Sequence, residues 1–417
     1  MSKESASLPL PAPPLRARVP LSKPLRHARY RQLWIANLIS NLGTWTQTFA
    51  SAWLIASVSH AASTTTLVQT ASYVPIFLFA LFAGVIADRV DRPKFLFLCN
   101  LFMALCACAM AAMVISGHAS AAPVLALTFC LGAGAAFMWP AWQASMSGLV
   151  DPDELEAAAS LNNLSYNVAA ILGPALGGLL FNWIGAGALF LVNALSFLGL
   201  LAVYWAWWRS RAPDPVPHAP FLASLRIGLA SALGCPRYRR ILVNVCSVFF
   251  ATICFAALLP VFVRDLLRMD SGVFGILMGS LGAGAVAAAF LLPSLRMRYD
   301  RTALLAASLT VYGAMLVLMP MLRSLALLVP LIVCGGMAWS ATISTMNAAA
   351  QSSFPPAIRA RTLSIYLFVM AGGYAAGSVF WGALADRFGV PAAFSAAGML
   401  VLANAMVLAG RRRAVPI

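Results

Sequence analysis

The sequence predicts an all-α membrane protein with twelve transmembrane helices in two pseudo-symmetric six-helix halves. Of its 417 residues, 61% are hydrophobic and only 10% are charged, whereas soluble proteins need about a quarter charged residues to solvate their surface. Twelve apolar runs are long enough to cross about 30 Å of hydrocarbon as helices. The runs are continuous and do not alternate, which excludes a transmembrane β-barrel.

The elements follow one another with short breaks, and Gly and Ala recur inside them, as in helices that pack closely in lipid. The predicted spans are residues 31–58, 66–88, 94–116, 123–149, 157–184, 186–208, 239–263, 272–293, 302–322, 324–350, 361–385 and 391–410. We expect five regions: a basic Pro-rich tail at 1–30, a first bundle at 31–208, a linker at 209–238, a second bundle at 239–410 and a basic tail at 411–417. The N-terminal tail lacks the apolar segment and cleavage site of a signal peptide.

An internal repeat supports two related halves. The tripeptides 29–31 and 237–239 are both Arg-Tyr-Arg, and they open the first and seventh spans at an offset of 208. A second set of landmarks recurs at an offset of 204: Pro152, Ser160, Gly173 and Gly178 match Pro356, Ser364, Gly377 and Gly382. Such halves, related by an axis along the membrane normal, are a recurrent transporter design with the substrate site between them.

The basic residues predict the topology, because Lys and Arg in short loops are retained on the cytoplasmic side. With both termini in the cytosol, 24 of the 28 Lys and Arg lie inside, and only Arg264, Arg268, Arg323 and Arg387 lie outside. The net charge of +16 is therefore an orientation signal and not a sign of nucleic-acid binding. We expect a multi-pass protein of the bacterial cytoplasmic (inner) membrane.

The loop after the second span carries a family motif. It reads Gly84-Val85-Ile86-Ala87-Asp88-Arg89-Val90-Asp91-Arg92-Pro93-Lys94. This resembles the cytoplasmic loop signature of the major facilitator superfamily, although Asp91 replaces the usual second Gly and Pro93 replaces one basic residue. The alternative is a solvated charged turn. The resemblance implies a cytoplasmic gate of Gly84, Asp88, Arg89 and Arg92, in which Asp88 pairs with Arg92 or with a neighbouring helix N-terminus.

A second motif lies in the fifth span, at Gly173, Pro174, Gly177 and Gly178. It resembles the Gly-Pro-x-x-Gly-Gly element that the superfamily uses mainly in its exporters. Pro174 removes a helix hydrogen bond and the glycines permit close helix contact, which predicts a kinked, pliable seam; the alternative is ordinary tight packing. With residues 41–45 and 139–143, the chain from 28 to 410 resembles the drug and siderophore exporter branch that includes enterobactin-exporter-like proteins. This resemblance implies alternating access and outward export, and names no substrate.

Charged groups are missing from the middle of the predicted spans. All 12 Asp and Glu and all four His lie in loops, tails or span ends, so the buried relay of many proton-driven pumps is absent. Proton antiport is therefore an inference that rests on the family resemblance alone. The substrate cavity is expected to be built from amides, hydroxyls and rings: Asn37, Asn41, Trp45, Thr48, Gln69, Tyr73, Trp139, Asn163, Tyr166, Asn167, Trp339, Tyr366, Met370 and Tyr374. Hydrogen bonding between helices is the competing role for each of these side chains, and interfacial anchoring competes for the tryptophans.

No catalytic or cofactor site is predicted. The eight cysteines lack metal-binding spacing, no phosphate-binding Gly-rich loop is present, and four loop histidines cannot complete a catalytic triad. The leading hypothesis is a monomeric, secondary-active exporter of small amphipathic or aromatic compounds, drug-like or siderophore-like, working among membrane lipids. A lipid or lysophospholipid translocator and a transport-inactive membrane sensor are the alternatives.

Overall fold

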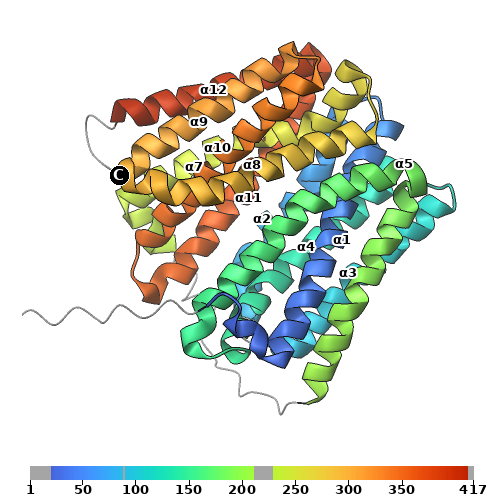
Figure 1. The fold of residues 1–417 in the computed structure, drawn as a ribbon, viewed down its shortest axis with the longest axis vertical. Helices are drawn as coiled ribbons and strands as arrows, with labels where there is room; N and C mark the ends of the chain where they lie inside the picture. Colours follow the sequence, from blue (N-terminus) through green and yellow to red (C-terminus); the bar gives the residue numbers. More distant parts are fainter. Residues whose placement is uncertain (1–19, 88–89, 211–228, 412–417) are drawn as a thin grey trace, which may run out of the picture.

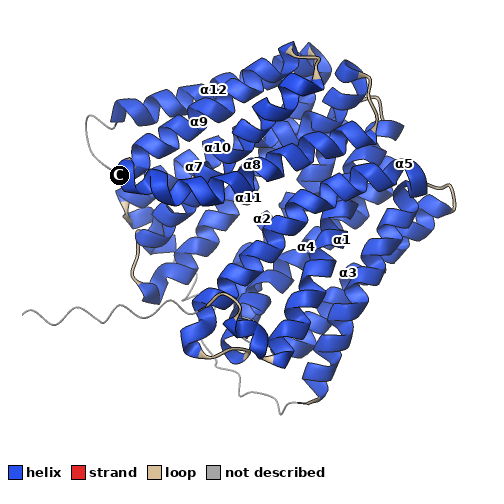
Figure 2. Ribbon diagram, in the orientation of Figure 1, coloured by secondary structure: helices blue, strands red, loops and turns tan. Residues whose placement is uncertain are grey.

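The computed structural model describes residues 20–87, 90–210 and 229–411. In this part of the chain all the regular elements are helical (Figures 1 and 2). Figure 1 shows the helices as two bundles, one coloured blue to green and the other yellow to red, that correspond to the two predicted halves. Most of the predicted linker and of both tails lies outside the described residues.

The first half contains five continuous long helices, one of which is bent back on itself. They are α1 (Ala28–Val58), α2 (Ala62–Ala87), α3 (Arg92–Ile115), α4 (Ala121–Ser145) and α5 (Leu155–Arg209), with short turns η1 (Lys23–Arg26), η2 (Met146–Gly148) and η3 (Pro152–Glu154). α5 covers the fifth and sixth predicted spans. Within it only Gly185 leaves helical dihedral angles, at φ 76° and ψ 171°, and only glycine adopts such a φ without strain. The turn therefore falls at Gly185, between the predicted spans 157–184 and 186–208, while the kinked seam at Pro174 stays a prediction.

The second half repeats this arrangement. Its elements are α7 (Pro236–Val261), η4 (Phe262–Leu267), α8 (Ser271–Arg298), α9 (Arg301–Leu318), η5 (Met319–Met321), α10 (Leu325–Ser352), α11 (Pro356–Phe388) and α12 (Val390–Arg411). Gly389, with φ 86°, is the single residue between α11 and α12. It stands 204 residues after Gly185, so the two halves turn at equivalent glycines.

The described chain contains ten helices that are long and apolar enough to span a membrane. One of them, Pro152–Arg209, crosses twice because of Gly185. α1 adds a further, more polar span of 31 residues. The predicted twelve-span fold is confirmed.

Aspartates set the starts of three helices. The carboxylates of Asp91, Asp270 and Asp300 accept hydrogen bonds from backbone N–H groups three residues later, at 3.0, 3.2 and 2.8 Å. Each thus satisfies one of the N–H groups that a helix leaves free in its first turn. Asp91 departs from the loop signature described above because it caps α3.

The repeat is visible in equivalent buried contacts. The hydroxyl of Tyr30 in α1 donates to the carbonyl of Ala158 in α5 at 2.9 Å, and that of Tyr238 in α7 donates to the carbonyl of Thr362 in α11 at 2.6 Å. Both rings are fully buried. The same tie therefore fixes the first helix of each half to the fifth.

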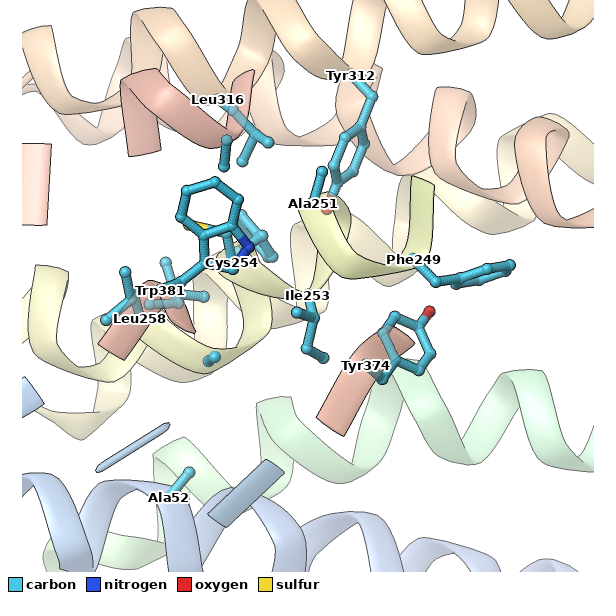
Figure 3. Close-up of a cluster of buried hydrophobic side chains, with 14 of the residues drawn as sticks. Ala52, Phe249, Ala251, Ile253, Cys254, Leu258, Tyr312, Leu316, Tyr374 and Trp381 are labelled. Atoms are coloured by element: carbon cyan, nitrogen blue, oxygen red, sulfur yellow. The ribbon is translucent and has the colours of Figure 1, made fainter. Parts of the chain in front are cut away.

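A cluster of buried hydrophobic side chains around α7 includes the rings of Tyr312 and Trp381 (Figure 3). Tyr312 of α9 donates its hydroxyl to the carbonyl of Thr252 at 3.1 Å, and the Trp381 indole of α11 donates to the carbonyl of Phe250 at 2.7 Å. Both acceptors are on α7. Buried Tyr and Trp are stabilising when their polar atoms find partners, and here those partners hold α7 between α9 and α11.

Candidate functional site

The two halves meet along two seams, α5 with α8 and α2 with α11. We call the side of the molecule where α1 begins and α12 ends the tail side, and the opposite side the far side. On the α5–α8 seam, a Cβ on Gly178 would lie 2.8 Å from Gly275 Cα, and a Cβ on Gly282 would lie 3.0 Å from Ile171 Cα. These positions lie in the far-side and middle parts of both helices.

The contacting face of α5 becomes exposed toward the tail side. Asn167 and Asn163 precede Ile171 by four and eight residues, which places them on the same face of the helix. Both side chains are exposed. On α8, Val286 and Phe290 follow Gly282 at the same spacing and are 36% and 78% exposed. The face of α5 that packs on α8 is therefore uncovered toward the tail side, where it carries polar side chains.

Three predicted aromatic residues form one cluster in the first half. The Tyr166 ring of α5 lies edge-on to Trp45 of α1, with ring centroids 5.6 Å apart, and edge-on to Trp139 of α4, with centroids 6.3 Å apart. Trp139 and Tyr166 are each 43% exposed. This aromatic cluster offers uncharged ring faces and a phenol hydroxyl beside Asn163 and Asn167.

A second predicted group crosses the α2–α11 seam. The rings of Tyr73 in α2 and Tyr374 in α11 have centroids 4.5 Å apart, and Phe249 of α7 lies edge-on to Tyr374 at 4.9 Å. Trp339 lies on α10 and is half-buried. Tyr366 lies two turns earlier on α11, is buried, and its hydroxyl has no hydrogen-bond partner among the described residues. Helices of both halves thus place aromatic side chains at the seam.

The remaining predicted cavity residues are half-buried: Asn37, Asn41, Thr48, Gln69 and Met370. The Thr48 hydroxyl donates to the carbonyl of Thr44 at 2.9 Å, within its own helix. Asn37, Asn41 and Thr48 share the face of α1 that carries Trp45. Their part in substrate binding stays a prediction.

The exporter-type element lies where α5 touches both α1 and α8. The carbonyl of Gly173 accepts a 3.2 Å hydrogen bond from the Thr46 hydroxyl, and a Cβ on Gly177 would lie 2.8 Å from the Phe49 ring of α1. Gly178 faces α8 of the other half. Pro174 is buried in the same turn. The element therefore packs one face of α5 inside the first half and another against the second half.

Part of the predicted gate can be located. Arg92 begins α3, and its Nη1 donates to the carbonyl of Ala144 near the end of α4 at 3.2 Å. Gly84 belongs to α2. Asp88 and Arg89 lie outside the described residues.

A buried amide pair was missed by the sequence analysis. The Asn193 side chain, in the second span of α5, donates to Gln47 Oε1 of α1, and Gln47 Nε2 donates to Met110 Sδ of α3 at 3.1 Å. A mid-span amide is itself a signal of an interior position in lipid. Gln47 escaped notice because it lies off the face of α1 shared by Asn41 and Trp45.

Ion pairs fasten the chain before α1 to the loop before α5. Lys23 Nζ lies 3.0 Å from Asp153 and 3.1 Å from Glu154, and His27 Nε2 lies 2.8 Å from Glu154. The hydrogen bond to Asp153, with a smaller contribution from Glu154, raises the pKa of Lys23. His27, Glu154 and Asp151 have potential ligand atoms within 4.8 Å of one another. Because Glu154 is already paired with Lys23 and His27, we interpret the group as an ion-pair network.

Comparisons with known proteins agree with this geometry. A family model described as transmembrane secretion effector matches residues 20–416. The uncharacterized MFS-type transporter YkuC of Bacillus subtilis is 26% identical over 42% of this chain, a match that spans 41% of that relative. The staphyloferrin A transporter of Staphylococcus aureus is 23% identical over 88% of this chain and 92% of its own, and the multidrug efflux pump Tap of Mycolicibacterium fortuitum is 23% identical over 88% and 91%.

A solved structure shares the fold. It is the bacterial homolog of the human lysosomal transporter Spinster, in an inward-facing and unoccupied conformation. The TM-score is 0.69 at 15% identity, with 93% of this chain and 95% of that chain covered.

Proposed function

The chain belongs to the transmembrane secretion effector family of the major facilitator superfamily, and from this membership we propose that it exports small amphipathic or aromatic compounds by alternating access. It is a multi-pass membrane transporter. The proposal adds the direction of transport, the substrate class and the location in a bacterial cytoplasmic membrane.

One observation carries the proposal: the face of α5 that packs on α8 at Gly178 and Ile171 is exposed at Asn167 and Asn163. We infer that the two halves enclose a cleft at this uncovered face. With both termini in the cytosol, as the basic residues predict, this cleft opens to the cytosol. An exporter loads its substrate in this state. The closely packed glycines of the exporter-type element lie on the far side of the cleft. They support export as the direction of transport.

The cleft chemistry suggests the substrate class. Trp45, Trp139 and Tyr166 offer rings for stacking, and Asn163 and Asn167 offer hydrogen bonds without a charge. Such a surface suits aromatic or amphipathic molecules, and cations can bind over the ring faces. Two relatives named for a siderophore and for multidrug efflux support a drug-like or siderophore-like substrate.

A groove at the α2–α11 seam favours lipid translocation as the second candidate function. It measures about 580 Å³ and is lined by Thr70, Val74 and Phe77 of α2, Cys246 of α7, and Gly372 and Val379 of α11, among others. This volume is in the range of small-molecule sites, and the lining lies near mid-span, level with hydrocarbon. The groove could admit an acyl chain from the side.

We further propose that the transporter works as a monomer among membrane lipids, without nucleic acid or catalysis. Each chain already contains both halves of the cleft, so a second copy is not needed to complete it. Protons are our first candidate for the coupling ion. Collapsing the pH gradient across proteoliposomes tests this: undiminished export would point to another ion or to facilitated diffusion.

Export itself can be tested with purified protein in proteoliposomes. The probes are a fluorescent aromatic cation, an iron-free siderophore and a fluorescent lysophospholipid. We expect transport of one of the first two and its loss in Tyr166→Ala, with Trp183→Ala as the matched control because Trp183 is 79% exposed near the far-side end of its span. Transport of the lysophospholipid alone would favour the second candidate. Transport of no probe, repeated in cells with a broad compound panel, would favour a membrane sensor.

A further inference from the structure

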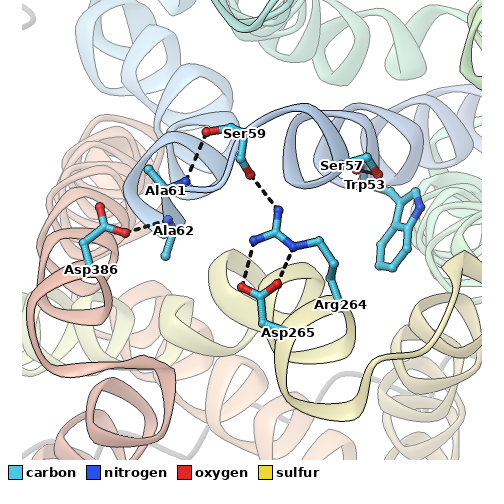
Figure 4. Close-up of polar contacts among 8 residues, drawn as sticks. All are labelled: Trp53, Ser57, Ser59, Ala61, Ala62, Arg264, Asp265 and Asp386. Atoms are coloured by element: carbon cyan, nitrogen blue, oxygen red, sulfur yellow. Dashed lines mark hydrogen bonds and ion pairs between the residues drawn. The ribbon is translucent and has the colours of Figure 1, made fainter.

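Asp386 joins the two halves at the far side (Figure 4). It lies in the last turn of α11, and its two carboxylate oxygens accept hydrogen bonds from the backbone N–H groups of Ala62 and Ser63, at 2.6 and 3.2 Å. These N–H groups belong to the first turn of α2, where no earlier carbonyl of the helix can pair with them. A carboxylate is also favoured there by the partial positive charge of the helix N-terminus. The contact therefore joins α11 of one half to α2 of the other through a charged group.

Asn182 makes the corresponding contact on the other seam. It lies near the far-side end of the first span of α5, donates to Asp270 Oδ2 at 3.1 Å, and accepts from the Ser271 hydroxyl at 2.7 Å. Asp270 and Ser271 form the start of α8. This contact also joins the end of one helix to the beginning of a helix in the other half.

The two contacts are related by the internal repeat. Asn182 and Asp386 are 204 residues apart, the offset that relates the fifth and eleventh spans, and Ser63 and Ser271 are 208 apart, the offset that relates the first and seventh. Four residues before each clasping side chain stands a glycine in close contact across its seam. A Cβ on Gly178 would lie 2.7 Å from the Ser271 carbonyl oxygen, and one on Gly382 would lie 2.8 Å from Ser63 Cα.

We infer that these contacts are the far-side gate of the transporter: the Asp386 clasp, formed by Asp386 with Ala62 and Ser63, and the Asn182 clasp, formed by Asn182 with Asp270 and Ser271. The inference rests on the alternating access proposed above, since release on the far side requires both seams to part there. Among the hydrogen bonds whose two partners are both described, those that join the halves lie at this side. Breaking the clasps therefore shifts the balance between two folded states and leaves the interior of each half intact.

The two clasps differ in strength. Both hydrogen bonds of the Asp386 clasp are accepted by a charged carboxylate, and charge-assisted hydrogen bonds are stronger than neutral ones. In the Asn182 clasp the charge belongs to Asp270, which already caps its own helix through the N–H of Val273 at 3.2 Å. We expect Asp386 to contribute more to closure than Asn182.

The charged groups around the Asp386 clasp strengthen the same closure. Arg264, next to α7, donates from Nη1 to the carbonyl of Ser59 at 2.6 Å, and its Nε and Nη2 bind Asp265 at 2.5 and 2.8 Å (Figure 4). The segment between α1 and α2 is thus held by the second half at both Ser59 and Ala62.

Far-side opening can be measured at Thr66. This residue is fully buried against Gly382, so a Thr66→Cys thiol reacts with a membrane-impermeant maleimide only when the seam parts. The background carries serine in place of the exposed native cysteines Cys108, Cys246 and Cys334. Labelling is followed in lipid nanodiscs without substrate.

Asp386→Asn is the informative variant, because Asn keeps the shape but has one acceptor oxygen for two N–H groups. We expect its labelling rate at Thr66→Cys to rise roughly tenfold, and that of Asn182→Ala to rise less. Asp300→Asn is the matched control: Asp300 caps α9 by accepting from the N–H of Ala303, and Asn caps a helix equally well. An unchanged rate in Asp386→Asn, or an equal rise in Asp300→Asn, overturns the inference.

The outcome is independent of substrate identity. If the wild type transports no probe but labelling responds to Asp386→Asn, the export proposal fails and the gate stands. If the wild type exports a probe and Asp386→Asn changes neither labelling nor export, the gate assignment fails and the export proposal stands.

Discussion

Gly178 of α5 and Gly275 of α8 bring the backbones of the two halves into direct contact: a Cβ on Gly275 would lie 2.9 Å from Gly178 Cα. Backbone cannot move aside as a flexible side chain can. The far side can therefore close only because both residues at this point of the seam are glycines.

Gly178→Ala should accordingly prevent the far side from closing fully. We expect export to fall by roughly tenfold, because overpacking costs about 1–3 kcal/mol and only the closed state has the crowded contact. Export and Thr66→Cys labelling in the same preparation check it. Gly199→Ala is the control, since its Cβ would meet Ala36 at an ordinary 3.6 Å. Full export by Gly178→Ala would show that the seam tolerates the methyl group.

The aromatic cluster predicts graded losses of binding. Tyr166→Ala should remove the ring that contacts both Trp45 and Trp139 and weaken ligand binding by roughly tenfold, a loss of about 1–1.5 kcal/mol, whereas Tyr166→Phe should retain most of it. Ligand-dependent thermal shift on purified protein measures the difference, because a ligand stabilises the state that it binds. Equal shifts in wild type and Tyr166→Ala would place the site elsewhere.

The repeated tyrosine tie predicts matched effects on stability. Tyr30→Phe and Tyr238→Phe each remove a buried hydrogen bond to a carbonyl, and each should lower the free energy of unfolding by about 1 kcal/mol. Thermal unfolding in detergent, followed by tryptophan fluorescence, compares the two. A large loss for one variant and none for the other would mean that the halves do not share this support.

The loop signature predicts a gate on the tail side. Asp88→Asn should leave membrane insertion intact and impair export severalfold, by weakening the state in which the tail side is closed. Asp91→Asn is the control, because Asn caps a helix as well as Asp does. Wild-type export by Asp88→Asn would remove the gate assignment.

Much of the fold could be predicted because lipid makes the signal strong. A span needs about 20 apolar residues, and the residues between spans are charged or turn-forming, so even the turn at Gly185, within one continuous apolar stretch, was placed correctly. The offset of 204 that pairs Gly178 with Gly382 proved to have a structural meaning, since both glycines lie in close contact across the seams.

The site could be predicted only in part, because the sequence gives the face of a helix but not its neighbour. The sequence grouped Trp45 with the amides of α1, yet its contact with Tyr166 depends on how α1 crosses α5. Likewise the sequence predicts for Asp386 only that, as for the other Asp and Glu, it lies in a loop, in a tail or at the end of a span. Its binding to Ala62 and Ser63, 324 and 323 residues away, follows from the packing of the halves.

The turns at Gly185 and Gly389 have a mechanical consequence. Each joins a seam helix to the next span through a single glycine with a positive φ, without a loop between the two spans. Such a joint transmits displacement instead of absorbing it. When the halves separate at the far side, we expect the two spans of α5 to move together and α11 to move together with α12. Each half then rotates as a rigid body, with the clasp residues at its far-side end.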